Sequence, residues 1–319
     1  TRNEIFALFN NHIKAVNAIY ESTDFGGVRG VNFNVQRTTI WDSSSCPNSD
    51  LEDPKKNSFC EDNVDVSNFL NLHSIKNHSD FCLAYVLTSR DFVGGTLGLA
   101  WVASTTSGGL FMYSFYDPPT DFCFSAKRES FGYSYEITSS GGLCEPYKWY
   151  SEGSKRVRRS LNTGIITLVN YHNRVPMKVS QLTLAHEIGH NFGSPHDFPA
   201  SCQPGSPEGN YIMFASATSG DKPNNAKFSP CSVANISAVL KEVLAQPPHL
   251  DMSGIRRNCL IDPMTSFCGN GVVEDGEQCD CGYDESECEQ RQDHCCYART
   301  TRGKLNENRC QRLPNANCR

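Results

Sequence analysis

The sequence predicts an α/β domain followed by a small module held by disulfides. Helical and strand-like segments alternate up to a helix near residue 190, which is the pattern of an α/β domain. From Phe267 onward the apolar periodicity stops, and 8 of the 16 cysteines follow residue 264. A chain of 319 residues has room for two domains.

The apolar spacing places the elements of the first domain in order. We expect helices at 5–20 and 66–73, and strands at 31–39, 81–88, 96–102 and 164–171. Gly98 lies inside one of these strands, where a glycine often marks the close approach of another backbone. That backbone could be a substrate added as an extra strand, and the alternative is a glycine needed only for packing.

The next helix carries a metal-binding pattern. Ser180 is the expected N-cap, and His186 and His190, four residues apart, project from one face. H-E-x-x-H on a helix is a zinc-protease signature, although the bare motif also occurs by chance. Gly193 is where the helix would end and the chain bend, which brings His196 as a third ligand.

Three protein ligands are typical of a catalytic zinc, because the fourth position stays open for water. Glu187 is the expected general base toward that water and the proton carrier to the leaving amine. The full H-E-x-x-H-x-x-G-x-x-H pattern is that of metzincins, in which a Met-turn follows further along the chain. Met213, in an apolar run, fits that turn as well as it fits ordinary core filling.

Composition limits the partners and the compartment. The net charge of −6 argues against nucleic acid as the main partner. Dense cysteines indicate an oxidising, secretory compartment, and the sequons at Asn77 and Asn235 agree with it. No 18-residue apolar stretch occurs, so we expect no membrane span here. The chain starts at Thr1 without a signal peptide, so we expect a processed product or a fragment.

Several motifs together resemble the ADAM metalloproteinases, and more narrowly their Kuzbanian, or alpha-secretase, branch. They are N-Y-I-M at 210–213, G-T-L-G-L-A-W-V at 95–102, S-L-N-T-G-I-I-T at 160–167, H-N-F-G-S-P-H-D at 190–197 and C-G-N-G-V-V-E-D-G-E-Q-C-D-C-G at 268–282. The resemblance implies a metzincin catalytic domain at 1–260, with a mixed twisted sheet, an active-site helix and a Met-turn. A disintegrin-like module would follow at 261–319.

The resemblance also implies roles for single residues. His186, His190 and His196 would bind zinc, Glu187 would be catalytic, and Met213 would form the Met-turn. An edge strand including Gly95, Thr96, Leu97, Gly98 and Leu99 would hold the substrate backbone. Cys144 would pair with Cys259, and Cys202 with Cys231. The family implies protein substrates, namely ectodomains of type I membrane proteins such as Notch-like receptors, and a cell-surface location through a membrane anchor absent from this chain.

The cysteine-rich part has two alternatives of its own. Its irregular cysteine spacing favours disulfides over a zinc module. By resemblance, Asn270, Glu274, Glu277 and Asp280 match a calcium loop, and closely spaced oxygen ligands suit a hard cation. The alternative is a solvated acidic turn.

Some features depart from the family. Cys82 would normally bond a cysteine in a first strand that this chain lacks, so its partner is absent or replaced. Cys46 and Cys60 are extra, and we expect them to pair. Residues 110–142 lie between two T-x-S-G-G-L-like repeats and form either an inserted cassette or a true surface loop. The run at 156–159, R-V-R-R, is either a furin-type site or a solvated basic turn.

Three functions compete at this point. The first is a zinc endopeptidase that sheds ectodomains. The second is an adhesion module whose disintegrin part binds a receptor. The third is a secreted, venom-like protease. The intact Glu187 and the three histidines favour an enzyme.

Overall fold

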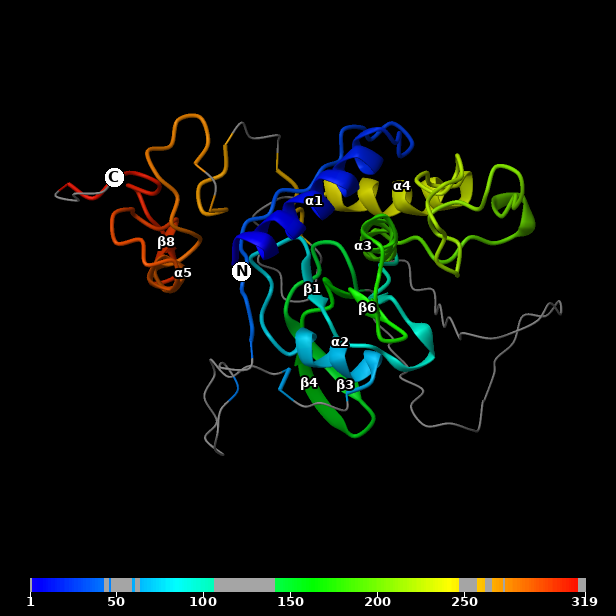
Figure 1. The fold of residues 1–319 in the computed structure, drawn as a ribbon, viewed down its shortest axis with the longest axis horizontal. Coiled ribbons are helices and arrows are strands. Elements are labelled where there is room, and N and C mark those ends of the chain that lie inside the picture. Colours follow the sequence, from blue (N-terminus) through cyan, green and yellow to red (C-terminus); the bar gives the residue numbers. More distant parts are fainter. Residues whose placement is uncertain are drawn as a thin grey trace. The chain divides into compact units, whose positions relative to one another are not determined.

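A computed structural model describes residues 2–42, 46, 59–60, 64–105, 141–246, 257–261, 266–271 and 273–314 (Figure 1). The chain forms two compact units. One comprises Thr1–Tyr20, Val31–Asn63 and Leu260–Arg319, and the other comprises Glu21–Gly30 and Val64–Cys259. The expected insert at 110–142 lies outside the described residues, except for Gly141 and Gly142.

The second unit is built on a mixed sheet, as predicted. Strand β5 (Thr163–Thr167) lies between β1 (Ala84–Thr88), which runs parallel to it, and β2 (Gly98–Ala100), which runs antiparallel. All five residues of β5 are buried, because a central strand covered on both faces has no solvent side. The predicted α/β architecture is therefore confirmed.

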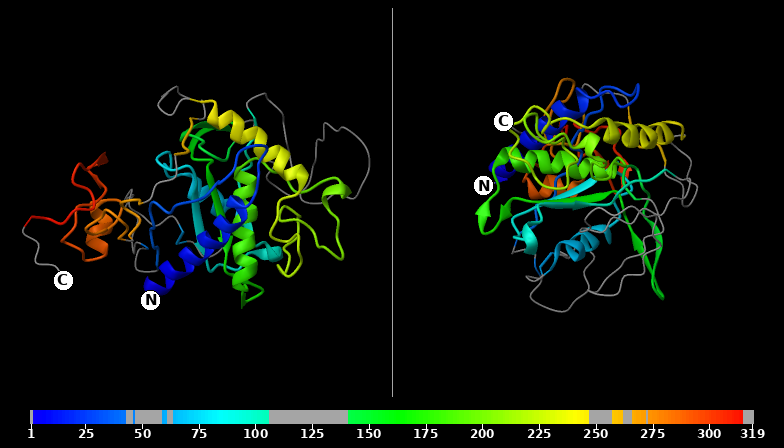
Figure 2. Two further views of the ribbon diagram at one scale, coloured as in Figure 1. Left: turned by 90° about the horizontal axis from the view of Figure 1, so that it is seen from above. Right: turned by 90° about the vertical axis from the view of Figure 1, so that its right-hand side faces the viewer.

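Helices α2 (Val66–Ser74) and α3 (Met177–Asn191) both contact β2 and β5. They lie on opposite faces of the sheet in the right-hand view of Figure 2. A further helix, α4 (Pro230–Leu244), begins with Ser229, whose side chain accepts a hydrogen bond from Ser232 N. The predicted N-cap of α3 is wrong, because the helix starts one turn earlier and Ser180 Oγ donates to Met177 O inside it.

Shorter elements connect these layers. A hairpin joins β3 (Lys148–Glu152) to β4 (Lys155–Arg159), and a second joins β6 (Val169–Asn170) to β7 (Asn173–Arg174). The strand predicted at 164–171 is shorter, because the chain turns back at Tyr171 and His172, where φ is 49° and 61°. Single turns of 3-10 helix, η2 and η3, occupy Val93–Gly95 and Ala200–Cys202.

The first unit contains α1 (Arg2–Glu21) and the extended segment that follows residue 30. The strand predicted at 31–39 is wrong, because these residues join no ladder. Instead the Asn17 side chain satisfies both backbone polar groups of Phe33. Its Nδ2 donates a hydrogen bond to Phe33 O, and its Oδ1 accepts one from Phe33 N. One amide side chain thus takes the place of a neighbouring strand.

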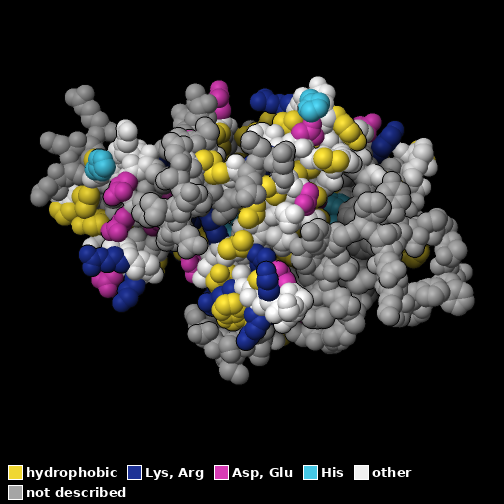
Figure 3. Space-filling model, turned by 90° about the horizontal axis from the view of Figure 1, so that it is seen from below, with side chains coloured by type: hydrophobic (Ala, Val, Ile, Leu, Met, Phe, Trp, Pro, Cys, Tyr) yellow, Lys and Arg dark blue, Asp and Glu magenta, His cyan; other side chains and the backbone are white. Residues whose placement is uncertain are grey.

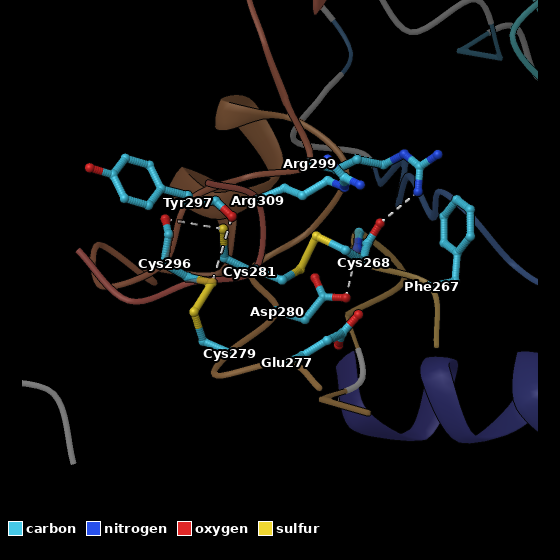
Figure 4. The surroundings of a disulfide bond; sticks show 12 residues. Phe267, Cys268, Glu277, Cys279, Asp280, Cys281, Cys296, Tyr297, Arg299 and Arg309 are labelled. Carbon is cyan, nitrogen blue, oxygen red and sulfur yellow. Dashed lines mark hydrogen bonds between the residues drawn. A yellow bond between two sulfur atoms is a disulfide. The ribbon is translucent and has the colours of Figure 1, made fainter. Parts of the chain in front are cut away.

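The C-terminal part of this unit has little regular structure. It contains α5 (Glu285–Gln290) and the short strands β8 (Thr300–Thr301) and β9 (Lys304–Leu305). Disulfides join Cys268 to Cys310, Cys279 to Cys296 and Cys281 to Cys288. The buried cluster consists of Cys281, Cys288, Cys296 and Ala298 (Figure 4). Disulfides therefore hold this module, as its sequence predicted. No described helix has the length and apolar character needed to cross a bilayer.

Candidate active site

The three predicted histidines meet at the C-terminal end of α3. Phe192 follows the last helical residue, and Gly193 then adopts φ +97°. A side chain at Gly193 would also collide with Val239, since a Cβ would lie 2.4 Å from Val239 Cγ2. Glycine is thus required there for both conformation and space. The resulting bend returns His196 to the helix.

The histidine rings face one another closely enough to share one ion. Ring centroids are 4.7 Å apart for His186 and His190, 5.2 Å for His186 and His196, and 4.9 Å for His190 and His196. One ligand atom from each ring lies within 4.8 Å of the other two. Three converging imidazoles suit zinc.

Backbone carbonyls set the tautomers of two of these rings. His186 Nδ1 lies 2.6 Å from Ile212 O, and His190 Nδ1 lies 2.7 Å from Ser194 O. A carbonyl oxygen only accepts, so each Nδ1 carries the proton and each Nε2 keeps its lone pair for a metal. Burial lowers the pKa of His186 to about 4, and it lowers the pKa of His190 and of His196 as well. The rings are neutral at neutral pH, as metal ligation requires.

Glu187 lies beside this trio and is 5% exposed. Burial raises the pKa of its carboxyl group to about 8. Gly98 of β2 packs directly on it, since a Cβ at Gly98 would lie 2.5 Å from Glu187 Oε1 and 2.7 Å from Cγ. The close neighbour that Gly98 signalled is therefore Glu187, a part of the fold itself.

Met213, the residue predicted to form the Met-turn, packs against Gly189 of α3. Its side chain is fully buried, and a Cβ at Gly189 of α3 would lie 2.5 Å from Met213 Sδ. Its carbonyl accepts a hydrogen bond from Asp197 N at 2.8 Å. The turn that holds Met213 is thus tied to the residue next to His196.

Asp197 is a positioning residue that the sequence reasoning missed. It is buried, and Oδ1 accepts hydrogen bonds from the hydroxyls of Ser229 and Ser232, the latter at 2.7 Å. Burial raises the pKa of Asp197, and these two hydroxyls oppose that shift. Both serines belong to the N-terminal end of α4, where the helix dipole favours a negative charge. The only sequence signal for this role was the position of Asp197, an acidic residue directly after the third histidine.

Asn191 is a second missed residue. It is fully buried, and its Oδ1 accepts from Tyr85 Oη at 2.6 Å. Its Nδ2 donates to Trp101 O at 2.7 Å and to Thr163 O at 3.3 Å. One amide thus joins the end of α3 to β1, to β5 and to the residue that follows β2, which fixes His190 relative to this edge of the sheet.

The expected substrate strand is only partly a strand. Gly95 ends η2, Thr96 and Leu97 lead into β2, and Gly98 and Leu99 belong to it. Thr167 N donates to Leu97 O and Trp101 N donates to Thr163 O, so the odd-numbered residues pair with β5. By alternation, the backbone groups of Gly98 and Ala100 point away from β5. Within the described sheet, β2 is an edge strand.

The cysteines of the second unit form one bonded pair and one cluster. Cys202 joins Cys231, as the family resemblance implied. Cys82, Cys144 and Cys259 lie together, and the Cα–Cα distance to Cys259 is 5.4 Å from both Cys82 and Cys144. A sulfur forms one disulfide at a time, so Cys259 pairs with one of the two.

The extra cysteine pair and the two predicted glycosylation sites lie in separate parts of the chain. Cys46 and Cys60 are joined by a disulfide in the first unit. Asn77 is exposed, and its side chain accepts from Ser79 N, whereas the exposed Asn235 lies in the middle of α4.

The four candidate calcium ligands occupy one loop of the disulfide-rich C-terminal part. Asp280 accepts from the backbone of Gly269, Asn270 and Gly282. Glu274 accepts from Phe267 N and from Asn270 Nδ2, and Glu277 accepts from Glu274 N. Figure 4 shows the carboxylates of Glu277 and Asp280 beside the disulfide of Cys268. The described acidic side chains of this loop do not all come within 4.8 Å of one another.

Comparisons with known proteins fit this geometry. The family described as "Metallo-peptidase family M12B Reprolysin-like" matches residues 5–242. The Caenorhabditis elegans "Disintegrin and metalloproteinase domain-containing protein 10 homolog" is 55% identical over 100% of this chain and 32% of its own length. Disintegrin and metalloproteinase domain-containing protein 10 of Bos taurus is 43% identical over 100% of the chain, and that of Homo sapiens is 44% identical over 93%. The chain spans about a third of each relative, at 36% and 33% of the latter two.

Proposed function

Because the chain belongs to the reprolysin-like metallopeptidases of family M12B, we propose that it is a zinc endopeptidase that cleaves the ectodomains of membrane proteins. The observation that carries this proposal is the meeting of three neutral histidines with the buried Glu187. Two of the histidines present an Nε2 lone pair, because their Nδ1 protons bond backbone carbonyls. A structural zinc site would have a fourth protein ligand, whereas this cluster has three and a carboxylate beside it.

His186, His190 and His196 would hold the ion. A bound zinc ion supplies Lewis-acid chemistry, acidifying water and polarising the scissile carbonyl. Glu187 is placed to accept a proton from the attacking water and to deliver it to the leaving amine. Burial raises the pKa of this carboxyl group, and the positive charge of a bound zinc ion would oppose that shift and favour the carboxylate that acts as the base. Gly98 keeps the space beside it clear.

The edge strand β2 is suited to present the substrate. The backbone N–H and C=O groups of Gly98 and Ala100 lie on its outer edge, where an extended peptide can add as a further strand. An antiparallel peptide bound there would pass Glu187, because Gly98 touches that side chain. Main-chain pairing of this kind accepts many sequences, which fits a protease with several protein substrates.

The finer assignments are part of the same proposal. The Kuzbanian-type motifs support type I membrane proteins, including Notch-like receptors, as substrates and a cell surface as the location. We assign residues 1–260 to the peptidase domain and 261–319 to the disintegrin-like module, and Asn77 and Asn235 as glycan acceptors. Calcium at residues 270–280 is supported by Glu277 Oε1, which is buried without a hydrogen-bond partner. Burial and the nearby Asp280 and Glu274 raise the pKa of Glu277, and a divalent cation would relieve that repulsion.

A cleavage assay tests the peptidase proposal. The protein, incubated with a peptide library, should cleave with zinc, lose cleavage with a chelator, and regain it when zinc is returned. Glu187→Gln should keep its zinc content and lose at least about 100-fold in kcat/KM, since general acid–base groups contribute on that scale. Cleavage that persists with chelator, or an active Glu187→Gln protein, would refute the mechanism. A Glu187→Gln protein that keeps full biological activity would favour adhesion instead.

A further inference from the structure

The hairpin β3–β4 carries a charged face that the peptidase site does not use. Its second strand holds the run K-R-V-R-R at 155–159, which includes the furin-like sequence. The hairpin does not suit furin-type cleavage. Arg159 is mostly buried and paired with Glu152, and the following Ser160 is fully buried. A protease would have to unfold the strand to reach this bond.

The two faces of the hairpin differ in charge. On one face, Glu145 pairs with Lys148, and Glu152 pairs with Arg159 at 3.1 Å. Both of these carboxylates are thus paired with a cation. The opposite face carries Trp149 and Ser151 on β3, facing Arg158 and Arg156 on β4. That face is cationic and has no acidic side chain among the described residues of the hairpin, whereas Lys155 pairs with Glu152 and lies on the other face.

Aromatic rings hold the two arginines of this face in place. The guanidinium carbon of Arg158 lies 4.5 Å from the centre of the Tyr147 ring, and that of Arg156 lies 5.7 Å from Trp149. Arg158 also donates to Tyr147 O at 3.4 Å. Stacked guanidinium groups lose little entropy on binding and keep their N–H edges free for an anion. Trp149 itself is 57% exposed.

We propose that this face, formed by Tyr147, Trp149, Arg156 and Arg158, binds a sulfated polysaccharide. Residues two apart on a strand lie about 7 Å apart on one face, so Arg156 and Arg158 form a line of charges suited to a linear polyanion. Guanidinium groups pair with sulfate oxygens through two parallel hydrogen bonds, as they do with phosphate. The exposed ring of Trp149 offers an apolar surface to a sugar ring between two sulfates. Figure 3, seen from the side on which the hairpin lies in Figure 1, shows basic and hydrophobic side chains gathered together.

Other polyanions fit this face less well. Attachment to an anionic membrane usually takes four to eight clustered basic residues, more than the two on this face. The chain as a whole carries −6, so its bulk charge does not attract nucleic acid. Its disulfides belong to an oxidising compartment, where basic runs of this kind meet heparin-like chains. An acidic peptide would match the arginines but would leave Trp149 without a ring to contact.

Binding of a heparin-derived dodecasaccharide, measured by calorimetry against salt concentration, tests the proposal. The double variant Arg156→Glu/Arg158→Glu should weaken binding at least about tenfold, and the slope of log affinity against log salt should fall by roughly two. The matched control is Arg302→Glu/Lys304→Glu, which makes the same charge change on the exposed hairpin β8–β9 and should bind as the parent does. Peptidase activity and the unfolding midpoint should be unchanged in both.

Three results would overturn the proposal: equal loss in both double variants, equal binding of the desulfated dodecasaccharide, or preference for phosphatidylserine vesicles or a polyglutamate peptide. If charge reversal disturbs folding, Arg156→Gln/Arg158→Gln provides the same test, because it removes both charges without reversing them and should also weaken binding. Arg156→Lys/Arg158→Lys should bind several-fold more weakly than the parent if the paired hydrogen bonds of arginine matter, and full binding would contradict the stacked geometry.

Discussion

Replacing Gly98 with alanine should impair catalysis by pushing Glu187 out of place. An added Cβ would lie 2.5 Å from Glu187 Oε1, 2.7 Å from Cγ and 2.8 Å from Cδ. Carbon atoms rest about 3.5 Å apart, so the carboxylate must move by roughly 0.8 Å. The strand itself accepts alanine, because Gly98 does not have a positive φ.

The size of the effect follows from that displacement. A shift near 1 Å at a catalytic group can cost about 100-fold in rate, which corresponds to about 2.7 kcal/mol of transition-state stabilisation. Stability should change little, since alanine in a strand is favoured over glycine by about 0.5–1 kcal/mol, which offsets part of the collision. We therefore expect kcat/KM to fall about 100-fold while zinc content and the unfolding midpoint stay close to those of the parent.

A double-mutant cycle isolates the cause. Peptide cleavage would be measured for the parent, Gly98→Ala, Glu187→Gln and the double variant. In the Glu187→Gln background, Gly98→Ala should cost little more, because the displaced base is already inactive. Undiminished cleavage by Gly98→Ala refutes the reasoning. So does an equal loss in both backgrounds, which would locate the effect in peptide binding rather than at Glu187.

Further predictions concern folding and the disulfides. Gly193→Ala should lower the free energy of unfolding by about 2–4 kcal/mol in urea titrations, since positive φ strain adds to overpacking against Val239, and a stable variant with normal zinc content would contradict this. His73 is buried and its pKa is lowered to about 3, mainly by burial, so below pH 6.5 the unfolded chain binds a proton that the folded chain rejects. Stability is fully present above pH 6.5 and should fall by about 2 kcal/mol between pH 7 and pH 5; His73→Gln should flatten this part of the curve, and an unchanged slope would exclude His73 as its source. In Cys144→Ser, non-reducing peptide mapping should find Cys259 bonded to Cys82, because both candidates have the same 5.4 Å Cα–Cα distance; a free Cys259 would contradict this.

The sequence predicted the residues that carry the chemistry of the site better than the residues that hold them in position. The spacing of His186, His190 and His196 implies a shared ion whatever surrounds them, and Gly193 signals the bend. Asp197 and Asn191 act through partners distant in the chain, such as Ser229 and Tyr85, and no local pattern contains that pairing. Their roles depend on tertiary packing, so only the structure reveals them.

The same distinction explains the errors in secondary structure. Alternation at 31–39 suggested a strand, but a ladder needs a neighbour, and a single asparagine side chain supplies the pairing instead. The hairpin at 148–159 escaped prediction because its half-buried face mixes the charged side chains of Lys148, Glu152 and Arg159 with Tyr150 and Val157, which hides the apolar alternation. Helix α4 had a readable signal in Ser229 followed by proline at the first helical position.

The contacts of Asp197 also make the third zinc ligand depend on a distant part of the chain. His186 and His190 lie four residues apart on α3. Asp197, next to His196, is bonded to Met213 and to Ser229 and Ser232 at the start of α4, the latter two more than thirty residues further along the chain. Substitutions at the start of α4 should therefore loosen one ligand of the set while leaving the other two on their helix.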